Sequence, residues 1–135
     1  MQLSITVPVV ANPEDVWSYF TEFNKRRLWE TDLEALAYDS PIAAGVTGTM
    51  KLSGMPEMPF EVVQAVPGGS FWDKTLIPGG ALVFGHGIAV ADGVTRITQT
   101  VRLDKASYDE DDLAFLMGVF GDTPQAAWRL KTLVE

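Results

Sequence analysis

The last quarter of the chain, from Ser107 to Val134, constrains the fold most, because its apolar residues recur with the period of a helix. The first apolar stripe, at intervals i, i+3, i+4 and i+7, consists of Leu113, Leu116, Met117 and Phe120. A second apolar run follows at Ala126, Leu130, Leu133 and Val134. Nothing upstream offers a comparable helix, so we expect strands to cover this apolar face.

Local signals predict where this helical segment starts and where it weakens. Ser107 and Glu110 have the spacing of a capping box. Gly118 and Gly121 weaken the middle, and Thr123-Pro124 is typical of a new helix start. The sequence therefore predicts either one long kinked helix or two short helices nearly in line.

The N-terminal part predicts a strand followed by a helical region. Residues 2–10 alternate between apolar and polar side chains, as in a strand. Asn12-Pro13-Glu14 then predicts a helix start, and the apolar face of that helix consists of Val16, Trp17, Phe20 and Phe23. For Lys25–Thr31 we expect an irregular turn or a second short helix, with Trp29 folding back onto the core.

From Asp32 to Leu103 the hydrophobic pattern has period 2, which predicts strands. The predicted strands are Leu33–Tyr38, Thr47–Ser53, Phe60–Val66, Ser70–Ile77, Ala81–Val90 and Thr95–Leu103. Short connectors rich in Gly and Pro make neighbouring strands antiparallel. We therefore predict a single α+β domain over residues 1–135, in which a seven-stranded antiparallel sheet curls around the terminal helix.

Composition excludes several classes of function. The chain has 135 residues, 47% hydrophobic content and a net charge of −8, so it is an acidic globular protein without a nucleic-acid-binding surface. The triplet Lys25-Arg26-Arg27 is interpreted as a solvated helix end. One histidine and no cysteine leave no support for a metal site, and we expect no cofactor. No apolar run approaches about 18 residues, so we expect a cytoplasmic protein without stable membrane insertion.

The order of elements resembles the helix-grip superfamily, which contains START lipid-transfer domains, polyketide cyclases and pathogenesis-related plant allergens (the SRPBCC group). The resemblance is carried by Asn12-Pro13-Glu14-Asp15-Val16-Trp17, Trp29, Gly45-Val46-Thr47-Gly48, Gly93-Val94-Thr95-Arg96-Ile97 and the closing helix. It implies a hydrophobic cavity between a curved sheet and the C-terminal helix, which binds lipids, polyketides or similar apolar molecules. No branch-specific motif is present, so the resemblance implies no catalytic residue.

Strand alternation predicts three polar side chains on the concave face of the sheet, namely Gln64, His86 and Gln99. A buried amide or imidazole without a partner costs about 1–3 kcal/mol. These side chains are therefore better explained if they face a ligand or water in a cavity. Each of them also has a purely structural interpretation as a satisfied core or rim residue.

Other cavity residues follow from the same reasoning. For Ser70–Ile77 the alternation is ambiguous, and we prefer Trp72 inward to the alternative with Phe71 and Asp73 inward; in that alternative Asp73 would be an acid–base partner for His86. The expected apolar walls are Trp17 or Phe20, Trp29, Met50, Phe60, Trp72, Phe84, Met117 and Phe120. Core filling is the competing interpretation for the methionines.

The sequence is compatible with three functions. The first is binding or transport of a small hydrophobic molecule such as a lipid, polyketide or aromatic metabolite, oriented by the three polar side chains. The alternative is a cofactor-independent cyclase or dehydratase that uses His86 as its catalytic acid or base. The third is an interaction module that uses the loop containing Met55 and Met58. The sequence leaves open whether the chain forms a homodimer.

Overall fold

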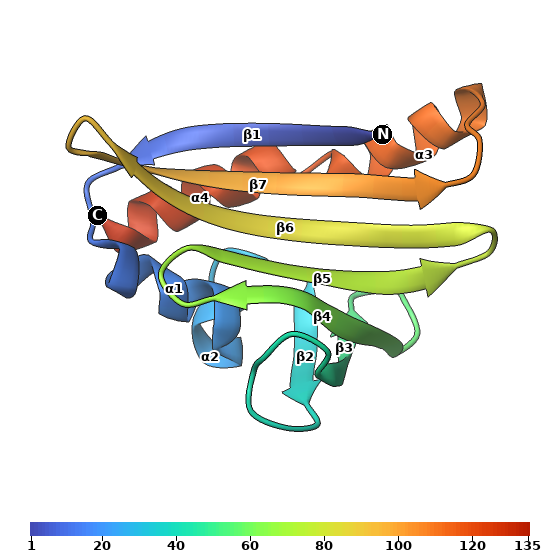
Figure 1. Cartoon of the computed structure of the whole chain (residues 1–135), viewed down its shortest axis with the longest axis horizontal. Coiled ribbons are helices and arrows are strands. Elements are labelled where there is room, and N and C mark those ends of the chain that lie inside the picture. The colour runs from blue at the N-terminus through green and yellow to red at the C-terminus, as the bar shows by residue number, and fades with distance from the viewer.

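The computed structural model describes residues 1–135 and contains seven strands and four helices (Figure 1). In chain order they are β1 (Gln2–Val9), α1 (Pro13–Thr21), α2 (Phe23–Arg26), β2 (Leu33–Tyr38), β3 (Thr47–Leu52), β4 (Met58–Val66), β5 (Ser70–Ile77), β6 (Gly80–Ala91), β7 (Val94–Lys105), α3 (Glu110–Phe120) and α4 (Thr123–Val134). The predicted strands are confirmed, with ends that shift by at most two residues.

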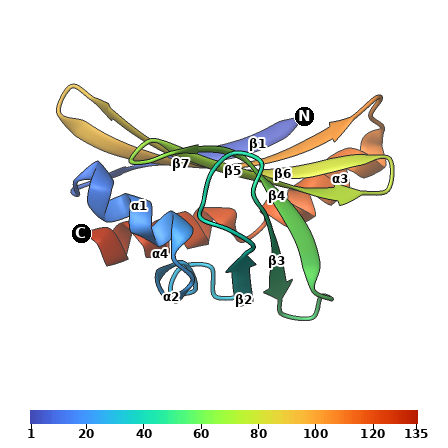
Figure 2. The same cartoon turned by 60° about the horizontal axis from the view of Figure 1, so that its bottom comes forward.

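All seven strands form one antiparallel sheet in the order β1-β7-β6-β5-β4-β3-β2. Figure 2 shows β2 and β3 turned away from the plane of β5, β6 and β7, so that the sheet curls toward α4. The N-terminal strand β1 pairs with β7 and thereby brings the first and last strands together. This is the curved sheet that the helical tail of the sequence requires.

The tail forms two helices, and its capping differs from the prediction. Asp109, not Ser107, caps α3: its carboxylate accepts from the backbone N–H of Asp112 at 3.0 Å, and the Asp112 carboxylate accepts from the N–H of Asp109 at 2.9 Å. At the second helix, Asp122 occupies the cap position and Thr123 is already helical. The shift by one or two residues reflects several adjacent capping residues competing for the same role.

Helix α3 buries much less of its apolar stripe than predicted. Only Leu116 is fully buried, whereas Leu113 is 42% exposed and Met117 is 57% exposed. The reason is the break between the helices: α3 packs on β7 and β1, over a small core cluster, while α4 lies under the curl of the sheet (Figures 1 and 2). That cluster consists of Leu82, Val101, Leu103 and Leu116. The prediction that Met117 faces the cavity is therefore wrong.

The main core lies between the concave face of the sheet, α1 and α4. Its members include Val16 and Phe20 of α1, Phe71 of β5 and Leu130 of α4, which are all fully buried. Trp29, as predicted, folds back onto this core, and its indole N–H donates to the carbonyl of Tyr19 at 2.8 Å.

Two strand orientations differ from the predictions. In β4 the register shifts between Val62 and Gln64, so Phe60 and Val62 point inward while Gln64 is exposed. This bulge reverses the alternation for the rest of the strand. In β5, Phe71 and Asp73 point inward and Trp72 lies on the convex face. Trp72 covers Gly85 of β6, where an added Cβ would come within 2.5 Å of the indole ring.

None of the helices combines the length and the apolar character that a crossing of the membrane requires.

Candidate functional site

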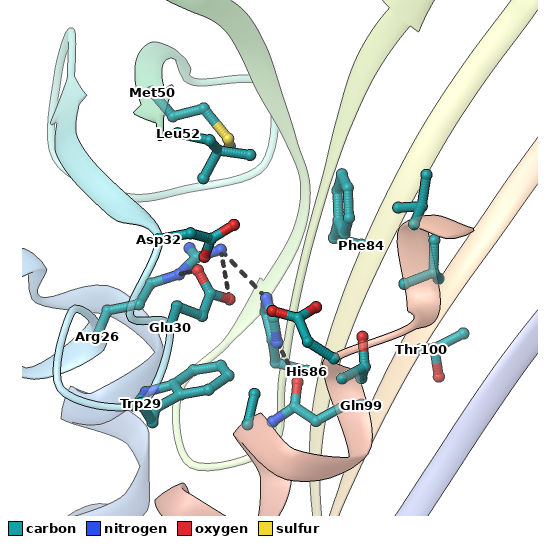
Figure 3. A pocket seen from close by; sticks show the side chains of 15 residues that line it. Arg26, Trp29, Glu30, Asp32, Met50, Leu52, Phe84, His86, Gln99 and Thr100 are labelled. Carbon is teal, nitrogen blue, oxygen red and sulfur yellow. Dashed lines mark hydrogen bonds and ion pairs between the residues drawn. The ribbon is translucent and has the colours of Figure 1, made fainter. Parts of the chain in front are cut away.

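An internal cavity of about 140 Å³ opens between the concave sheet and the helices (Figure 3). Its lining comprises Arg26, Trp29, Glu30, Asp32, Met50, Leu52, Phe84, His86, Gln99, Thr100, Val101, Val119, Asp122, Thr123 and Ala126. These residues come from α2 and the segment after it, from β3, β6 and β7, and from α3 and α4. The cavity therefore lies where α2, the inner face of the sheet and the junction between α3 and α4 meet.

Hairpin geometry places the two polar side chains of the sheet beside each other. Asp92 and Gly93 both have positive φ, at 53° and 75°, as a tight two-residue turn between β6 and β7 requires. The register that follows pairs His86 with Gln99 directly across the two strands. Both side chains are buried on the concave face, so the predicted inward orientation of His86 and Gln99 is confirmed.

Arg26 is the buried cation of the site. Its Nε and Nη2 atoms donate to the two carboxylate oxygens of Glu30, at 3.1 and 3.3 Å, across the turn that follows α2. Its Nη2 also lies 3.4 Å from Nε2 of His86, and its Nη1 lies 4.0 Å from the carboxylate of Asp73. Burial alone would lower the pKa of Arg26, but the carboxylates of Glu30 and Asp73 outweigh it and raise that pKa. The guanidinium is therefore permanently charged.

These contacts determine the protonation state of His86. A guanidinium can only donate, so Nε2 of His86 must accept from Arg26. The ring proton then resides on Nδ1, which donates to Oε1 of Gln99. Burial, together with the nearby charge of Arg26, lowers the pKa of His86 to about 3. The imidazole is a neutral hydrogen-bonding link between Arg26 and Gln99 (Figure 3).

Aromatic rings surround this imidazole. Phe20, Trp29 and Phe71 have ring centroids 5.4, 5.7 and 6.1 Å from that of His86. His86 is only 4% exposed, and packing against three aromatic rings restricts the orientation of the imidazole. His86 is thus held in place by its neighbours rather than free to change partners.

The amide of Gln99 is only half satisfied. Its oxygen accepts from His86, but its Nε2 is buried and has no hydrogen-bond partner. Gln99 is 2% exposed and lines the cavity. A buried donor without an acceptor is costly, and a ligand acceptor in the cavity would relieve that cost.

Asp73 is a second unsatisfied group. Its carboxylate is fully buried and neither oxygen has a hydrogen-bond partner. Burial raises the pKa of Asp73 to about 7; the charge of Arg26 opposes this rise, and that of Glu30 adds to it. Asp73 is not among the residues that line the cavity, and the guanidinium of Arg26 contacts both it and His86. Asp73 therefore influences the site only through its charge interaction with Arg26, and it makes no hydrogen bond to His86.

The structure brings together half of the predicted binding residues. Trp29, Met50, Phe84, His86 and Gln99 all line the cavity. The other five do not: Phe60 is buried in the main core, Phe120 is half-buried beside the second cluster, and Gln64, Trp72 and Met117 point elsewhere. The predictions that Gln64, Trp72 and Met117 line the cavity are therefore wrong. The bulge in β4 turns Gln64 outward, the register of β5 places Trp72 on the convex face, and the break between α3 and α4 leaves Met117 exposed.

Sequence reasoning missed the charged half of the site. The sequence predicts a solvated helix end for Arg26, but the side chain is 3% exposed, so this prediction is wrong. The spacing of Arg26 and Glu30, four residues apart on a helical turn, was the available signal for a paired arginine. Asp32 and Asp122, which are 90 positions apart, line the same cavity only because the fold brings them together, and no local pattern indicates this.

A curved antiparallel sheet, a C-terminal helix under it and an internal cavity define a helix-grip protein. The sequence matches the family model described as "Polyketide cyclase / dehydrase and lipid transport" over residues 1–131. The chain belongs to this family. No curated protein matches its sequence at a significant level.

Solved structures with the same fold have little sequence in common with the chain. Protein MLL2253 from Mesorhizobium loti superposes with a TM-score of 0.75 at 14% identity, over 98% of this chain and 96% of that one. The Aha1 dimer from Colwellia psychrerythraea gives 0.70 at 14% identity, over 100% and 96%. Truncated norcoclaurine synthase from Thalictrum flavum gives 0.68 at 10% identity, over 99% and 92%. At these identities the likeness concerns the fold alone.

Proposed function

We propose that the chain binds a small, mostly apolar molecule that carries a hydrogen-bond acceptor, and that it does so in the cavity beside His86 and Gln99. The observation that carries this proposal is Gln99, a residue of the cavity lining whose buried amide Nε2 has no hydrogen-bond partner. Most binding sites for small molecules combine apolar walls with a few placed polar groups in this way. The apolar walls here include Trp29, Met50 and Phe84.

The size of the cavity narrows the ligand class. Its volume of about 140 Å³ is close to the roughly 150 Å³ at which an apolar protein cavity accommodates one benzene ring. Drug-sized ligands occupy pockets of about 300–1,000 Å³. Among lipids, polyketides and aromatic metabolites, the volume therefore favours a molecule about the size of a single ring.

The contacts of His86 favour binding over acid–base catalysis. Both ring nitrogens are engaged, and its pKa of about 3 leaves the imidazole neutral at physiological pH. A general acid or base needs a pKa near the working pH and a nitrogen free to meet the substrate. In this proposal His86 orients the Gln99 amide, so that its N–H₂ group faces the ligand.

Acetophenone, a single ring with one carbonyl acceptor, is a suitable probe. The protein has four tryptophans, and of these only Trp29 lines the cavity. In ¹H–¹⁵N spectra we expect titration with acetophenone to shift the indole resonance of Trp29 and to leave those of Trp17, Trp72 and Trp128 in place. Native mass spectrometry of freshly purified protein would detect a retained natural ligand.

A cavity-filling variant provides the control. Ala126 lies in α4 on the cavity wall and is buried, so Ala126→Leu should occupy the ligand space and remove the Trp29 shift. Ala114→Leu makes the same change on the exposed side of α3 and should leave binding intact. If acetophenone shifts no cavity resonance, or binds Ala126→Leu as well as the parent protein, the proposed function is wrong.

A further inference from the structure

Carboxylates outnumber cations on the wall of the cavity. Glu30, Asp32 and Asp122 line it, and Arg26 is its single cationic side chain. The guanidinium of Arg26 is already bonded through two nitrogens to both oxygens of Glu30. The remaining two carboxylates, Asp32 and Asp122, have no ion-pair partner.

These two carboxylates mark the mouth of the cavity. Asp32 and Asp122 are exposed, whereas Arg26, His86 and Gln99 are buried at its inner end. The pKa of Asp32 is raised by partial burial and by the neighbouring charges of Asp122 and Glu30. A backbone hydrogen bond and the charge of Arg129 act in the opposite direction but are outweighed. The cavity wall thus carries three carboxylates and one cation, Arg26, and Arg129 offsets the negative potential at the mouth only in part.

An independent observation points to a ligand at this place. Gln99 belongs to the lining of the same cavity, and its buried amide nitrogen lacks an acceptor. Acidic side chains at a protein surface are ordinarily solvated and carry no information about a ligand. Here Asp32 and Asp122 lie at the opening of the cavity that Gln99 also lines, so one occupant would contact all three residues.

We propose that this occupant is a small organic cation, with an apolar body about the size of one ring inside the cavity and a protonated amine at the mouth between Asp32 and Asp122. This inference rests on the proposed function and specifies its ligand class. The amine belongs at the mouth because the inner end contains the buried guanidinium of Arg26, which would repel it. The body would contact Met50 and Phe84, with any acceptor at its far end reaching Gln99 (Figure 3).

Three compounds of nearly equal size test the charge preference: benzylamine, benzyl alcohol and benzoate. Their dissociation constants can be measured at pH 7 and low salt from the Trp29 indole shift. Two partly solvated carboxylates each contribute up to about 1 kcal/mol, so benzylamine should bind roughly tenfold more tightly than benzyl alcohol. Benzoate should bind more weakly than either.

The double variant Asp32→Asn/Asp122→Asn removes the two charges while preserving shape, and it should bring benzylamine to within about twofold of benzyl alcohol. Glu57→Gln/Asp111→Asn removes two exposed charges that do not line the cavity, and it should retain the preference. This comparison separates the effect of the mouth from that of the net charge.

The outcomes distinguish the two proposals. If the three compounds bind equally, if benzoate binds most tightly, or if the Asp32/Asp122 variant keeps the preference for benzylamine, the ligand is not a cation recognised at this mouth, while cavity binding itself stands. If benzylamine and acetophenone both leave the Trp29 resonance unchanged, both proposals are overturned.

Discussion

The guanidinium of Arg26 and the imidazole of His86 meet at 3.4 Å in the interior of the protein, although the residues are 60 positions apart in the sequence. This contact joins the short helix α2 to the middle of the sheet. It also determines that Nδ1 of His86 carries the ring proton. His86 therefore donates to the oxygen of the Gln99 amide, and the amide nitrogen is left without a partner. One buried arginine therefore sets the hydrogen-bonding character of the cavity wall.

Replacing Arg26 should destabilise the fold strongly. Arg26→Met preserves most of the side-chain volume but leaves the buried Asp73 and the half-buried Glu30 without their cation. Removing one partner of a buried ion pair costs about 3–5 kcal/mol. We expect a loss of that order in the free energy of unfolding, measured by urea denaturation. The neighbouring Arg27 is exposed, and Arg27→Met should change stability by less than about 0.5 kcal/mol.

His86 should remain neutral throughout the physiological range. It is the only histidine, so its ring signals are unambiguous in long-range ¹H–¹⁵N correlation spectra. We expect a proton on Nδ1, an unprotonated Nε2 and no titration between pH 5 and pH 8, because the pKa of His86 is lowered to about 3. A titration midpoint near the ordinary value of about 6.5 would contradict the assigned hydrogen bonds.

The fold was predictable from the sequence because the strand and helix periods are clear and the turn residues lie between them. The orientation of β5 could also be predicted from the sequence. The hairpin at Gly79, with its positive φ, pairs Ile77 with Gly80 and so pairs Phe71 with His86. Since cross-strand partners share a face, an inward His86 requires an inward Phe71, and alternation then sends Asp73 inward too. The pattern of β5 alone is ambiguous, because either face can be apolar.

Other parts of the site could not be predicted from the sequence. The bulge that turns Gln64 outward has no marker in its own strand, where Val62 and Val63 are equally apolar. The helix break that exposes Met117 was anticipated, but the different packing of the two halves depends on the sheet beneath them. Contacts between distant segments, such as that of Arg26 with His86, follow from the assembled fold and not from local patterns.

Asp73 should make the protein less stable as the pH rises. Its pKa is raised to about 7 in the folded state, against an ordinary value of 3.8, so the folded state binds more protons between these values. The associated stability is complete below about pH 4 and is lost as the pH approaches about 7. Asp73→Asn removes this dependence. The free energy of unfolding of the parent protein, relative to Asp73→Asn, should therefore fall by more than about 1 kcal/mol from pH 5 to pH 8.

The comparison with Asp73→Asn cancels the opposite contribution of His86, which is present in both proteins and is lost as the pH falls below about 6.5. Asp111→Asn, at an exposed position on α3, gives the control, and its difference from the parent should stay flat over the same range. A flat difference for Asp73→Asn as well would mean that Asp73 is ionised in the fold at an ordinary pKa.

The packing of Trp72 on Gly85 should make that glycine irreplaceable. Gly85→Ala would place a Cβ 2.5 Å from the indole ring, which is itself covered by the guanidinium of Arg102 at 5.5 Å. Overpacking of this kind costs about 1–3 kcal/mol. Gly87, two residues along the same face of β6, has no atom closer than 3.9 Å to an added Cβ. Thermal unfolding should show a clear loss for Gly85→Ala and little change for Gly87→Ala; equal effects would contradict the outward position of Trp72.

Gln99 should determine whether the cavity prefers a hydrogen-bond acceptor. Acetophenone and α-methylstyrene have nearly the same shape, but only acetophenone has an oxygen that can accept from the free Nε2 of Gln99. Leaving that donor unpaired costs about 1–3 kcal/mol, so the parent protein should bind acetophenone about five- to a hundredfold more tightly. Gln99→Leu removes the donor and should abolish or reverse the preference, as measured by the Trp29 shift. Because Gln99→Leu also leaves Nδ1 of His86 without its acceptor, circular dichroism must first show that the variant is folded. A folded Gln99→Leu that still prefers acetophenone would place the ligand's oxygen against another group.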